Sequence, residues 1–346
     1  MGLKIRLPII LGLLLLVVTG CGQESSSTDS EGSSGNEGSS GNNGETFTLK
    51  LGTALTDGDP IYDGLVAFSE AVGEKTDGDV QIEIFGSGSL GEDNDLVEQA
   101  KSGANVAVLV DSGRLADMVP EIGILSAPYI VDNYDEANQV VQSDLFKTWE
   151  DRLAEEQNLQ VLSFNWYQGE RHMLTNKLIE KPDDLKGLNI RTIDAPIALK
   201  TMEALGASPT GMAWTEVYPG LQQGVIDATE AQHPATYGAN LFEVIDYITK
   251  TRHFQLLTGI VTSSQWMEAL PNEYQDIIYE EAVKHGKTAS ENTVESLAEY
   301  EQMMIDEGVE VNEVDIDLFK EATDSVYEEF EGYKELREAF NDILGK

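Results

Sequence analysis

The arginines of this sequence are the side chains with the clearest chemical use. The chain has 62 Asp and Glu residues against 22 Lys and Arg, and only seven of these cations are arginines. Three of the seven, Arg114, Arg171 and Arg191, each end a short run that is typical of a strand or a turn. A guanidinium group binds a carboxylate through two parallel hydrogen bonds, which the ammonium group of lysine cannot do. The scarcity and placement of these arginines therefore predict recognition of a carboxylate.

Other reactive side chains do not form a known catalytic or metal-binding pattern. The four histidines have no metal-ligand spacing. Asp57 and Asp59 resemble the start of a calcium loop, but the residues that follow lack its later ligands. The sequence contains no nucleophile elbow of the form Gly-x-Ser-x-Gly. We therefore predict no metal, no cofactor and no enzyme activity.

The first 21 residues have the pattern of an export signal. Lys4 and Arg6 form a short basic start, and residues 9–18 are almost wholly apolar but too few to cross a bilayer. The segment ends in Val-Thr-Gly-Cys, which resembles the lipobox of bacterial lipoproteins. That resemblance implies lipidation of Cys21 and an extracytoplasmic protein anchored to the cell membrane. Because Cys21 is the only cysteine, the folded part has no disulfide and no thiol chemistry.

The acidic composition limits the class of partner. The formal net charge is −40, and removal of the signal together with Lys4 and Arg6 makes it −42. Such a chain repels the phosphates of nucleic acids, so nucleic acid is excluded as a partner. Concentrated salt would screen the mutual repulsion of the acids, since the Debye length is roughly 3 Å at 1 M. A saline habitat is a hypothesis that this composition favours.

One glycine-rich motif offers a second kind of chemistry. Residues 86–91, Gly-Ser-Gly-Ser-Leu-Gly, follow a predicted strand and precede a predicted helix, and Asp111 lies twenty residues later. This is the arrangement of a dinucleotide-binding loop, so a secreted NAD-binding oxidoreductase is one alternative. An exported protein has no dependable supply of NAD, and glycines also serve simply to turn a strand into a helix. We favour the second interpretation.

The elements that position these residues are predicted from hydrophobic periodicity. Residues 22–45 are nearly all Gly, Ser, Asn and acids, which predicts a flexible linker. From residue 46 on, β-rich runs alternate with amphipathic stretches, which predicts α/β lobes. Two long helical stretches are predicted between Ser264 and Met304. The other predicted elements are the strands Phe47–Leu51, Val80–Phe85, Val106–Val110 and Leu159–Asn165, and the helices 62–75 and 93–101.

Four motifs in a fixed order resemble one known family. They are residues 181–191, 204–209, 212–218 and 221–227. Their order is similar to that in the solute-binding proteins of tripartite ATP-independent periplasmic (TRAP) transporters, and the resemblance extends from about Phe47 to Gly332. It implies a periplasmic-binding-protein-like fold with two α/β lobes, a ligand cleft between them and a long helix that spans both.

The same resemblance divides the folded part of the chain into two lobes. Lobe 1 is expected to comprise 46–168 and about 254–293. Lobe 2 is expected to comprise 169–253 and about 294–346. Two lobes also suit the length, because 346 residues exceed the size at which one core usually keeps growing.

The resemblance further implies roles for the charged residues. Arg191 is expected to form a two-pronged salt bridge with the ligand carboxylate, and Arg171 to contact the same group or an adjacent hydroxyl. Asp111 and Arg114 fall where sialic-acid-binding members carry an acid and an arginine that face the ligand. Pairing of Asp111 with Arg114 is the alternative for these two residues.

Aromatic and acidic side chains complete the expected ligand site. Trp214 falls where many members place an aromatic ring against the ligand, and Trp166, beside Tyr167, is a weaker candidate of the same kind. Position 231 is Ala231 where the family often has Asn, so Glu230 is expected to accept a hydrogen bond from a ligand hydroxyl instead. Packing in the core is the alternative for the aromatic residues.

The implied function is the capture of an organic acid outside the cell by closure of the cleft, and its delivery to the subunits of a membrane permease. The ligand would be a sugar acid or a dicarboxylate, and Trp214 favours a sugar acid. The protein is expected to be a monomer that is attached to the membrane through the lipid on Cys21. A ligand-sensing lipoprotein of the same fold is an alternative that the residues do not distinguish.

Overall fold

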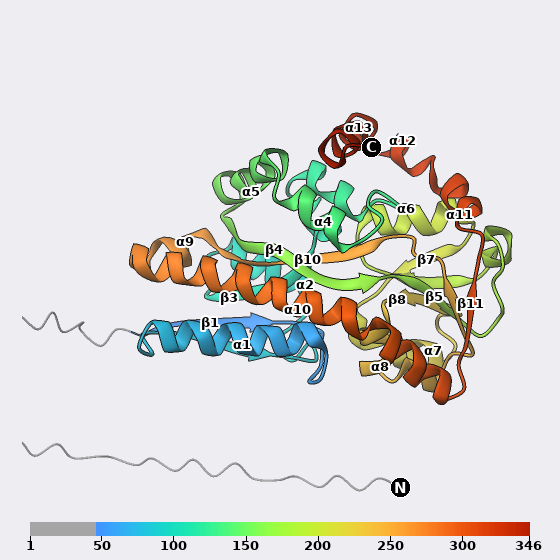
Figure 1. The fold of residues 1–346 in the computed structure, drawn as a ribbon, viewed down its shortest axis with the longest axis horizontal. Helices are drawn as coiled ribbons and strands as arrows, with labels where there is room; N and C mark the ends of the chain where they lie inside the picture. Colours follow the sequence, from blue (N-terminus) through green and yellow to red (C-terminus); the bar gives the residue numbers. More distant parts are fainter. Residues whose placement is uncertain (1–45) are drawn as a thin grey trace, which may run out of the picture. The chain divides into compact units, whose positions relative to one another are not determined.

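Two β-sheets organise the part of the chain that the structure describes. The structure is a computed structural model and describes residues 46–346. The predicted signal, Cys21 and the linker 22–45 lie outside these residues. Figure 1 shows the two sheets with helices packed on them, and the long orange helix running past both. The expected α/β fold with a helix spanning two lobes is therefore confirmed.

The first sheet forms the centre of the first lobe. It contains β1 (Phe47–Gly52), β2 (Val80–Phe85), β3 (Val106–Asp111), β4 (Leu159–Glu170) and β10 (Gln255–Ser263), in the order β2-β1-β3-β10-β4. The strands β2, β1 and β3 are parallel, and the helices α1 (Pro60–Lys75) and α2 (Asp93–Lys101) connect them. β10 runs antiparallel to its neighbours β3 and β4.

The strands and helices predicted for this lobe are present. β4 continues to Glu170, beyond its predicted end at Asn165. Nearly every residue of β4 is buried, so the strand lacks the polar alternation that would have shown its length.

The second sheet forms the centre of the second lobe and has six strands of four residues each. Its order is β11-β9-β5-β8-β6-β7, in which β6 is parallel to β7 and β8, and β5 is antiparallel to β8 and β9. The strands are β5 (His172–Thr175), β6 (Asn189–Thr192), β7 (Ser208–Gly211), β8 (Ala228–Ala231), β9 (Tyr247–Lys250) and β11 (Glu310–Glu313).

Shorter helices connect these strands or cover the sheets. They are α3 (Ser112–Leu115), α4 (Tyr134–Val141), α5 (Asp144–Gln157), α6 (Pro196–Ala204), α7 (Val217–Gln222), α8 (His233–Gly238), α11 (Ile316–Thr323), α12 (Val326–Glu329) and α13 (Tyr333–Leu344). Four 3-10 helices accompany them in residues 46–346: η1 (Pro120–Ser126), η2 (Pro182–Leu185), η3 (Trp214–Glu216) and η4 (Leu241–Glu243).

One helix dominates the region in which two long helices were predicted. A short helix, α9 (Ser264–Glu268), ends before Pro271, and the 35-residue α10 (Asn272–Asp306) follows. The prediction of two long helices was wrong because the helix before Pro271 has only five residues, and Pro271 lies at the start of α10, where a missing N–H costs nothing. α10 packs against α1 and β4 of the first lobe and against α8 and β11 of the second.

The chain passes between the lobes at several points. β4 continues through Arg171 into β5, residues 251–254 lead from β9 back to β10, and α10 spans both lobes. The first two connections are bonded to each other, because the amide of Arg171 donates to the carbonyl of Phe254 at 3.0 Å. The two backbone connections are therefore held together where they pass between the lobes.

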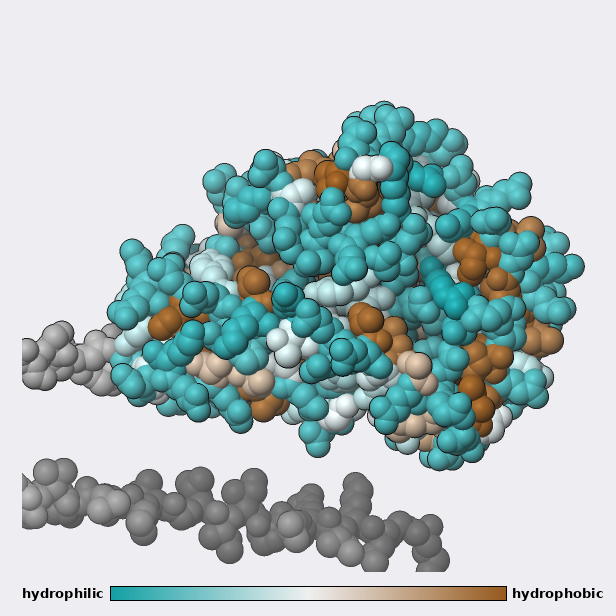
Figure 2. All heavy atoms as spheres, viewed as in Figure 1, coloured by the Kyte–Doolittle hydropathy of each residue, from teal (hydrophilic) through white to brown (hydrophobic). Residues whose placement is uncertain are grey.

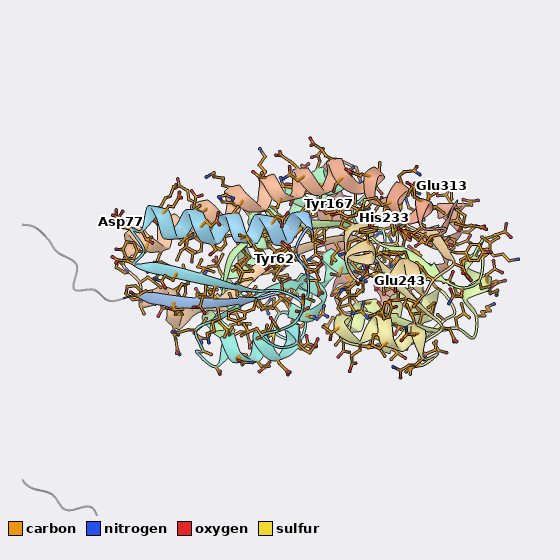
Figure 3. All side chains as sticks on the ribbon, turned by 90° about the horizontal axis from the view of Figure 1, so that it is seen from below. Tyr62, Asp77, Tyr167, His233, Glu243 and Glu313 are labelled. Atoms are coloured by element: carbon orange, nitrogen blue, oxygen red, sulfur yellow. The ribbon has the colours of Figure 1, made fainter. Side chains whose placement is uncertain are left out.

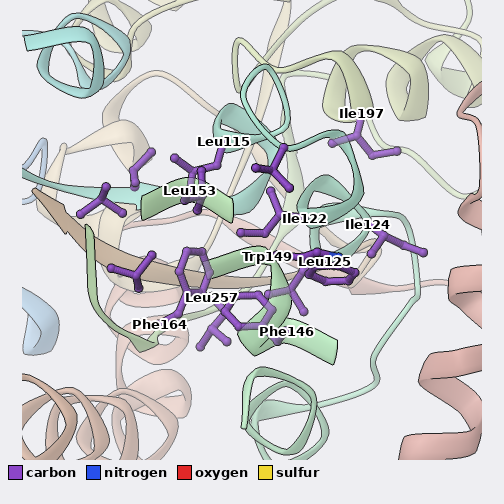
Figure 4. Packing of buried hydrophobic residues seen from close by; sticks show 14 of the residues in the cluster. Leu115, Ile122, Ile124, Leu125, Phe146, Trp149, Leu153, Phe164, Ile197 and Leu257 are labelled. Atoms are coloured by element: carbon purple, nitrogen blue, oxygen red, sulfur yellow. The ribbon is translucent and has the colours of Figure 1, made fainter. Parts of the chain in front are cut away.

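Two apolar clusters cover the two faces of the first sheet. On β3, Val106, Val108 and Val110 belong to one cluster, and Ala107 and Leu109 to the other, as alternation along a strand requires. Figure 4 shows part of the first cluster, which includes residues of α3, η1 and α5. The second cluster lies under α1 and the first half of α10.

The C-terminal helices contribute to the first of these clusters. Tyr327 and Tyr333 are buried in it and donate hydrogen bonds to the carbonyls of Pro128, at 2.6 Å, and Pro120, at 2.9 Å. Phe340 of α13 belongs to the same cluster. The lobe boundaries given above stay a prediction, and this packing favours placing α12 and α13 with the first lobe.

Hydrophilic side chains cover most of the face shown in Figure 2, with small apolar areas between them. This coverage agrees with the large excess of acids in the sequence. Within residues 46–346, none of the helices has both the length and the apolar character that a membrane span requires.

Candidate functional site

A pocket that opens to solvent lies between the two lobes, and about 500 Å³ in and around it, open solvent included, is not filled by atoms. Five residues that the sequence marked as ligand contacts line it, namely Arg114, Arg171, Arg191, Asp111 and Trp214. The other lining residues are Thr53, Ala54, Leu55, Asp93, Leu109, Gln168, Ile193, Gln232, Ala235, Leu256 and Thr258.

The topology explains why these residues meet. β1, β3, β6 and β8 all end at the pocket, and the residues at or just beyond their carboxyl ends line it. In open α/β sheets a ligand binds at the carboxyl ends of the strands, because the loops that follow them meet there. The pocket is therefore placed where the fold favours a ligand.

Arg191 is the cation of the pocket that lacks an acidic partner. It is 2% exposed, and its Nε donates to the carbonyl of Met212 at 2.9 Å. Its guanidinium carbon lies 5.3 Å from the centre of the Trp214 ring. No carboxylate of residues 46–346 forms an ion pair with it. Burial, and then the nearby Arg171, lower the pKa of Arg191 to about 9, so the group is still a cation at neutral pH.

Arg171, in contrast, is held by partners on every side. Its Nε pairs with the carboxylate of Glu230, its Nη2 donates to the carbonyl of Glu230, and its Nη1 donates to Gln232 at 2.8 Å. The guanidinium also lies over the ring of Phe254, 5.4 Å from its centre. These contacts fix the direction in which Arg171 faces the pocket.

Glu230 lies behind the pocket and does not line it. Its carboxylate is fully buried and accepts hydrogen bonds from Arg171 and from Thr192, the latter at 2.7 Å, and His253 lies 3.2 Å away. Burial opposes its ionisation, but Arg171 and His253 outweigh burial and lower its pKa. The expected hydrogen bond to a ligand hydroxyl is not available in this arrangement, because Glu230 faces Arg171 across the strand end.

Asp111, Arg114 and Asp93 form a charged group on the opposite wall. Arg114 pairs with Asp111 through its side chain, and its Nη2 lies 3.6 Å from Asp93. Asp111 also caps α3 by accepting from the amide of Arg114 at 3.1 Å. The alternative of mutual pairing is therefore present in the structure together with a position in the pocket wall.

The pKa directions in this group reflect burial and mutual attraction. Burial disfavours the cation of Arg114, but Asp111 and Asp93 outweigh it and raise its pKa. Burial raises the pKa of Asp93, and Arg114 opposes that effect. The Nε of Arg114 is buried and has no hydrogen-bond partner in residues 46–346, so it is a donor that a ligand could use.

The two tryptophans lie in different places. Trp214 is partly buried and lines the pocket beneath Arg191. Trp166 is fully buried among the residues under α1 and α10, and its indole N–H donates to Ser163 at 2.8 Å. Tyr167 is also in the core, where its hydroxyl bonds Gln255. Trp166 lies away from the pocket because β4 carries it on the face that the helices cover.

Several pocket residues were not found from the sequence. Gln168 and Gln232 bond each other at 2.9 Å, and Gln168 donates to Thr258 at 3.2 Å, so they link the lobes at the base of the pocket. Gln168 comes directly before residues 169–171, a Gly-Glu-Arg motif that ends in Arg171, and Gln232 follows Glu230 closely. Asp93 begins α2 directly after the glycine-rich loop. Closeness to a motif was the one signal that could have found them.

The glycine-rich loop 86–91 does not offer its amides to a phosphate. Those of Ser87 and Gly88 donate to the carbonyls of Leu55 and Thr53, at 2.8 and 3.0 Å, and those of Ser89 and Gly91 donate within the loop. A dinucleotide loop needs free amides that face the pyrophosphate. The geometry therefore supports the interpretation that these glycines turn the chain between β2 and α2.

A second set of charges lies where the chain passes between the lobes, and we call it the hinge ring. Arg252 forms ion pairs with Glu170 (3.2 Å) and Glu313 (2.8 Å). Lys250 forms ion pairs with Glu313 (3.1 Å) and Glu301 (2.8 Å). The ring consists of Glu170, His172, His233, Lys250, Arg252, Glu301 and Glu313. Figure 3 shows His233 and Glu313 near the second-lobe end of α10.

Two histidines close this ring. His233 lies 3.1 Å from Glu301, its ring centre lies 4.7 Å from that of His172, and His172 lies 3.4 Å from Glu170. Burial is the largest influence on both histidines and lowers their pKa values. Residues 46–346 contain no group of three His, Cys, Asp or Glu side chains arranged to hold a metal ion.

The fold and the pocket together define a two-lobed solute-binding protein. Residues 51–333 match the family of bacterial extracellular solute-binding proteins, family 7 (DctP), and the chain belongs to this family. Members of this family bind solutes outside the cytoplasm as part of a transport system.

Three solved structures illustrate the relationship. A TRAP periplasmic solute-binding protein of Escherichia fergusonii, open and without ligand, is 40% identical with a TM-score of 0.75, covering 86% of this chain and 99% of its own. A relative from Actinobacillus succinogenes with bound L-galactonate is 30% identical, with a TM-score of 0.82 and coverage of 85% and 99%. One from Fusobacterium nucleatum with bound sn-glycerol-3-phosphate is 29% identical, with a TM-score of 0.83 and coverage of 86% and 98%.

The structure superposes better on the two ligand-bound relatives than on the open one, although the open one has the more similar sequence. In its arrangement of lobes this structure therefore resembles the ligand-bound relatives more than the open one.

Proposed function

We propose that the protein is the binding component of a TRAP transporter and that it captures a carboxylate-bearing organic acid in the pocket between its lobes. The observation that carries the proposal is Arg191, a buried guanidinium without a carboxylate partner in residues 46–346. A buried charge without a counter-charge is costly. An anionic ligand would supply the missing charge, and its two oxygens match the guanidinium fork.

Arg171 would act beside Arg191 as a positioned second cation. Glu230 and Gln232 hold its guanidinium, so it need not be ordered when the ligand arrives. Ordering a long side chain on binding costs free energy, and prior ordering avoids that cost. We therefore assign Glu230 a positioning role through Arg171 in place of a direct ligand contact.

The opposite wall favours hydroxyl groups over a second carboxylate. Asp93 and Asp111 share Arg114, so this group is negative by one charge when all three are ionised. A ligand hydroxyl can donate to these carboxylates, whereas a second ligand carboxylate would be repelled. Trp214 offers a flat apolar face for a carbon chain. We infer a hydroxylated monocarboxylate of the sugar-acid class, to which L-galactonate, the ligand of one relative, belongs.

Capture would proceed by closure of the lobes on the ligand. Arg191 and Trp214 belong to the second lobe and Asp111 and Arg114 to the first, so a ligand that contacts both walls favours the closed arrangement. Closure removes water, which strengthens the charge-assisted hydrogen bonds. No bond of the ligand is broken in this cycle, so the protein would act without catalysis.

Delivery and attachment complete the proposal. The closed monomer would hand its ligand to the permease subunits of the transporter, and the lipid on Cys21 would hold it at the outer face of the cell membrane. A ligand-sensing lipoprotein would share the same pocket. The two differ in the partner, so uptake of the ligand by cells that contain the permease genes distinguishes them.

A thermal-shift screen of organic acids, followed by calorimetry, tests the ligand class. The panel contains L-galactonate, D-glucuronate, succinate, sn-glycerol-3-phosphate and, as a neutral control, galactitol. We expect sugar acids to bind and succinate and galactitol not to bind. Tight binding of succinate or of the phosphate alone would contradict the proposed class.

Arg191→Lys tests the site itself. Lysine keeps the positive charge but lacks the planar fork, so the affinity for the best acid should fall by about tenfold or more. An Arg191→Lys variant with full affinity would refute the assignment of the carboxylate to this residue. Arg152→Lys, a change at a surface arginine paired with Glu121, is the matched control and should leave the affinity unchanged.

A further inference from the structure

The two lobes also touch beside the pocket, next to the lining residues Trp214 and Asp93. Thr215 of η3 donates through its hydroxyl to the carboxylate of Glu92, the residue before α2, at 3.0 Å. Close by, a Cβ placed on Gly88 would lie 2.8 Å from Cγ2 of Thr215. The glycine-rich loop of the first lobe therefore lies directly against the second lobe.

The first-lobe side of this contact is fixed in place. The amides of Ser87 and Gly88 bond the carbonyls of Leu55 and Thr53, which both line the pocket. Gly88 has a φ of +66°, a conformation that residues with a Cβ seldom adopt. These backbone hydrogen bonds hold the loop in place, so Thr215 cannot come closer without breaking them.

The residues next to this contact line the ligand pocket on both sides. Trp214 precedes Thr215 in the chain, and Asp93 follows Glu92. A ligand between Trp214 and Asp93 would therefore contact the two segments that carry Thr215 and Glu92. Because Trp214 and Thr215 are adjacent in the chain, as are Glu92 and Asp93, the position of the ligand affects whether the contact between Thr215 and Glu92 forms.

We propose that the loop 86–92 and Thr215 form a latch that closes the mouth of the pocket when ligand is bound, and that glycine at position 88 is required for it to close. The proposal rests on the proposed function, since a latch needs a ligand to enclose. One hydrogen bond at such a position shifts an open–closed equilibrium by about two- to tenfold. The latch therefore sets the rate of ligand release more than the rate of capture.

A side chain at position 88 would clash with Thr215, and no rotation of Thr215 removes the clash and also keeps its hydrogen bond to Glu92. Thr215 is β-branched, so its Cγ2 and its hydroxyl are carried on the same Cβ. Rotation that moves Cγ2 away from a new methyl group also moves the hydroxyl away from Glu92. An alanine at position 88 thus either opens the lobes or breaks the hydrogen bond of the latch.

Three variants of the full chain test the latch. Gly88→Ala introduces the clash. Gly78→Ala is the matched control, because Gly78 also has a positive φ, of +85°, but a Cβ there meets no atom within 4 Å. Both substitutions place an alanine at a positive φ, and only the first brings its Cβ against the other lobe. The double variant Gly88→Ala, Thr215→Ser removes Cγ2 while keeping the hydroxyl for Glu92.

Affinity and release rate are measured with the acid of the above panel that the wild type binds most tightly, L-galactonate being tried first. We expect Gly88→Ala to release it about two- to tenfold faster, with the association rate nearly unchanged. Gly78→Ala should bind like the wild type, and the double variant should recover most of the loss. Equal release rates for Gly88→Ala and Gly78→Ala, or no recovery in the double variant, would overturn the latch.

A second measurement separates failure of the latch from failure of the proposed function. Spin labels on cysteines introduced at the exposed positions Asn94 and Gln223, with Cys21→Ser, report the distance across the mouth. Gly88→Ala should show a smaller closed fraction than Gly78→Ala. If the wild type binds no acid of the panel, the proposed ligand class fails. A ligand-free closed fraction that is smaller in Gly88→Ala than in Gly78→Ala still supports the contact between the loop 86–92 and Thr215, and equal fractions overturn it.

Discussion

The charges that line the pocket and the charges behind it are paired to different degrees. In the pocket, Arg191 has no acidic partner in residues 46–346, and Nε of Arg114 has no hydrogen-bond partner. Arg171 also lines the pocket, but all three of its nitrogens are bonded to Glu230 and Gln232, and Glu230 lies behind the pocket. In the hinge ring, Lys250 pairs with two glutamates and Arg252 with two.

This difference separates stability from binding. When one partner of a buried ion pair is removed, the free energy of unfolding falls, because the remaining buried charge has no counter-charge. An unpaired buried charge is already costly in the free protein, and a ligand removes that cost. Substitutions behind the pocket should therefore lower the stability of the fold, whereas substitutions in the pocket should lower affinity.

Glu230→Gln should give the largest effect on stability. It removes the counter-charge of Arg171 and leaves that cation buried, which costs about 3–5 kcal/mol of unfolding free energy. Glutamine has nearly the same shape, so little of the loss comes from packing. Urea denaturation of the ligand-free protein measures it. An unfolding free energy within experimental error of the wild type would show that Glu230 is not the group that compensates Arg171.

Arg191→Met should show the opposite pattern. It replaces the unpaired cation with an apolar side chain of similar length, so the unfolding free energy should stay the same or rise. The affinity for an organic acid should fall by about 2–5 kcal/mol, as on loss of one partner of a buried charge pair. Calorimetry and urea denaturation of the same sample measure both quantities. A large loss of stability in Arg191→Met would refute the contrast between the two regions.

The sequence predicted the strands and helices that carry strong patterns, and not those that lack them. Buried runs such as Val106–Val110 were found because they are apolar throughout. The six four-residue strands of the second sheet gave little periodicity, so the prediction of that lobe rested mainly on the family resemblance. The prediction of two long helices between Ser264 and Met304 was wrong because only the five-residue α9 precedes Pro271, and a single helix of 35 residues follows it.

The ligand pocket was predicted in part for the same physical reason. Arg191, Arg171 and Trp214 were carried over from motifs, and all three line the pocket. Trp166 and Glu230 lie one layer behind it, because a sequence motif identifies a strand end but not the face on which each side chain lies. The hinge ring joins residues from 170 to 313, a long-range pairing that spacing along the chain cannot show.

Lys250→Met should weaken the hinge ring by a smaller amount. Lys250 pairs with Glu301 and Glu313, and both pairs are partly exposed, so the loss should be on the order of 1 kcal/mol. Ligand affinity should change little, because the ring does not line the pocket. Urea denaturation at pH 7 measures the loss. A drop in affinity larger than the drop in stability would place the ring in the binding site after all.

The pH dependence of stability sharpens this test. Bonding to Arg252 and Lys250 lowers the pKa of Glu313 to about 2 from its ordinary value of 4.5, and the pKa of Glu301 is lowered mainly by Lys250 against burial. Because these folded-state values lie below the unfolded ones, the stabilisation is present above pH 4.5 and is lost as the pH falls toward 2. Lys250→Met should therefore lose less stability than the wild type over that interval.

Added salt should have the smallest effect on ligand binding. It distinguishes the long-range repulsion of the approaching ligand from the short-range contacts of the bound one. An organic anion that approaches a chain of formal charge −40 is repelled at long range. Raising the ionic strength from about 0.01 to 0.15 M shortens the Debye length from roughly 30 to 8 Å, so association should become a few times faster. Dissociation should hardly change, because Arg191 and its ligand are buried and are screened little. Stopped-flow measurements over this range give both rates. An association rate that falls steeply with salt would mean that the pocket attracts anions from a distance, and that its cations are not outweighed by the acids around them.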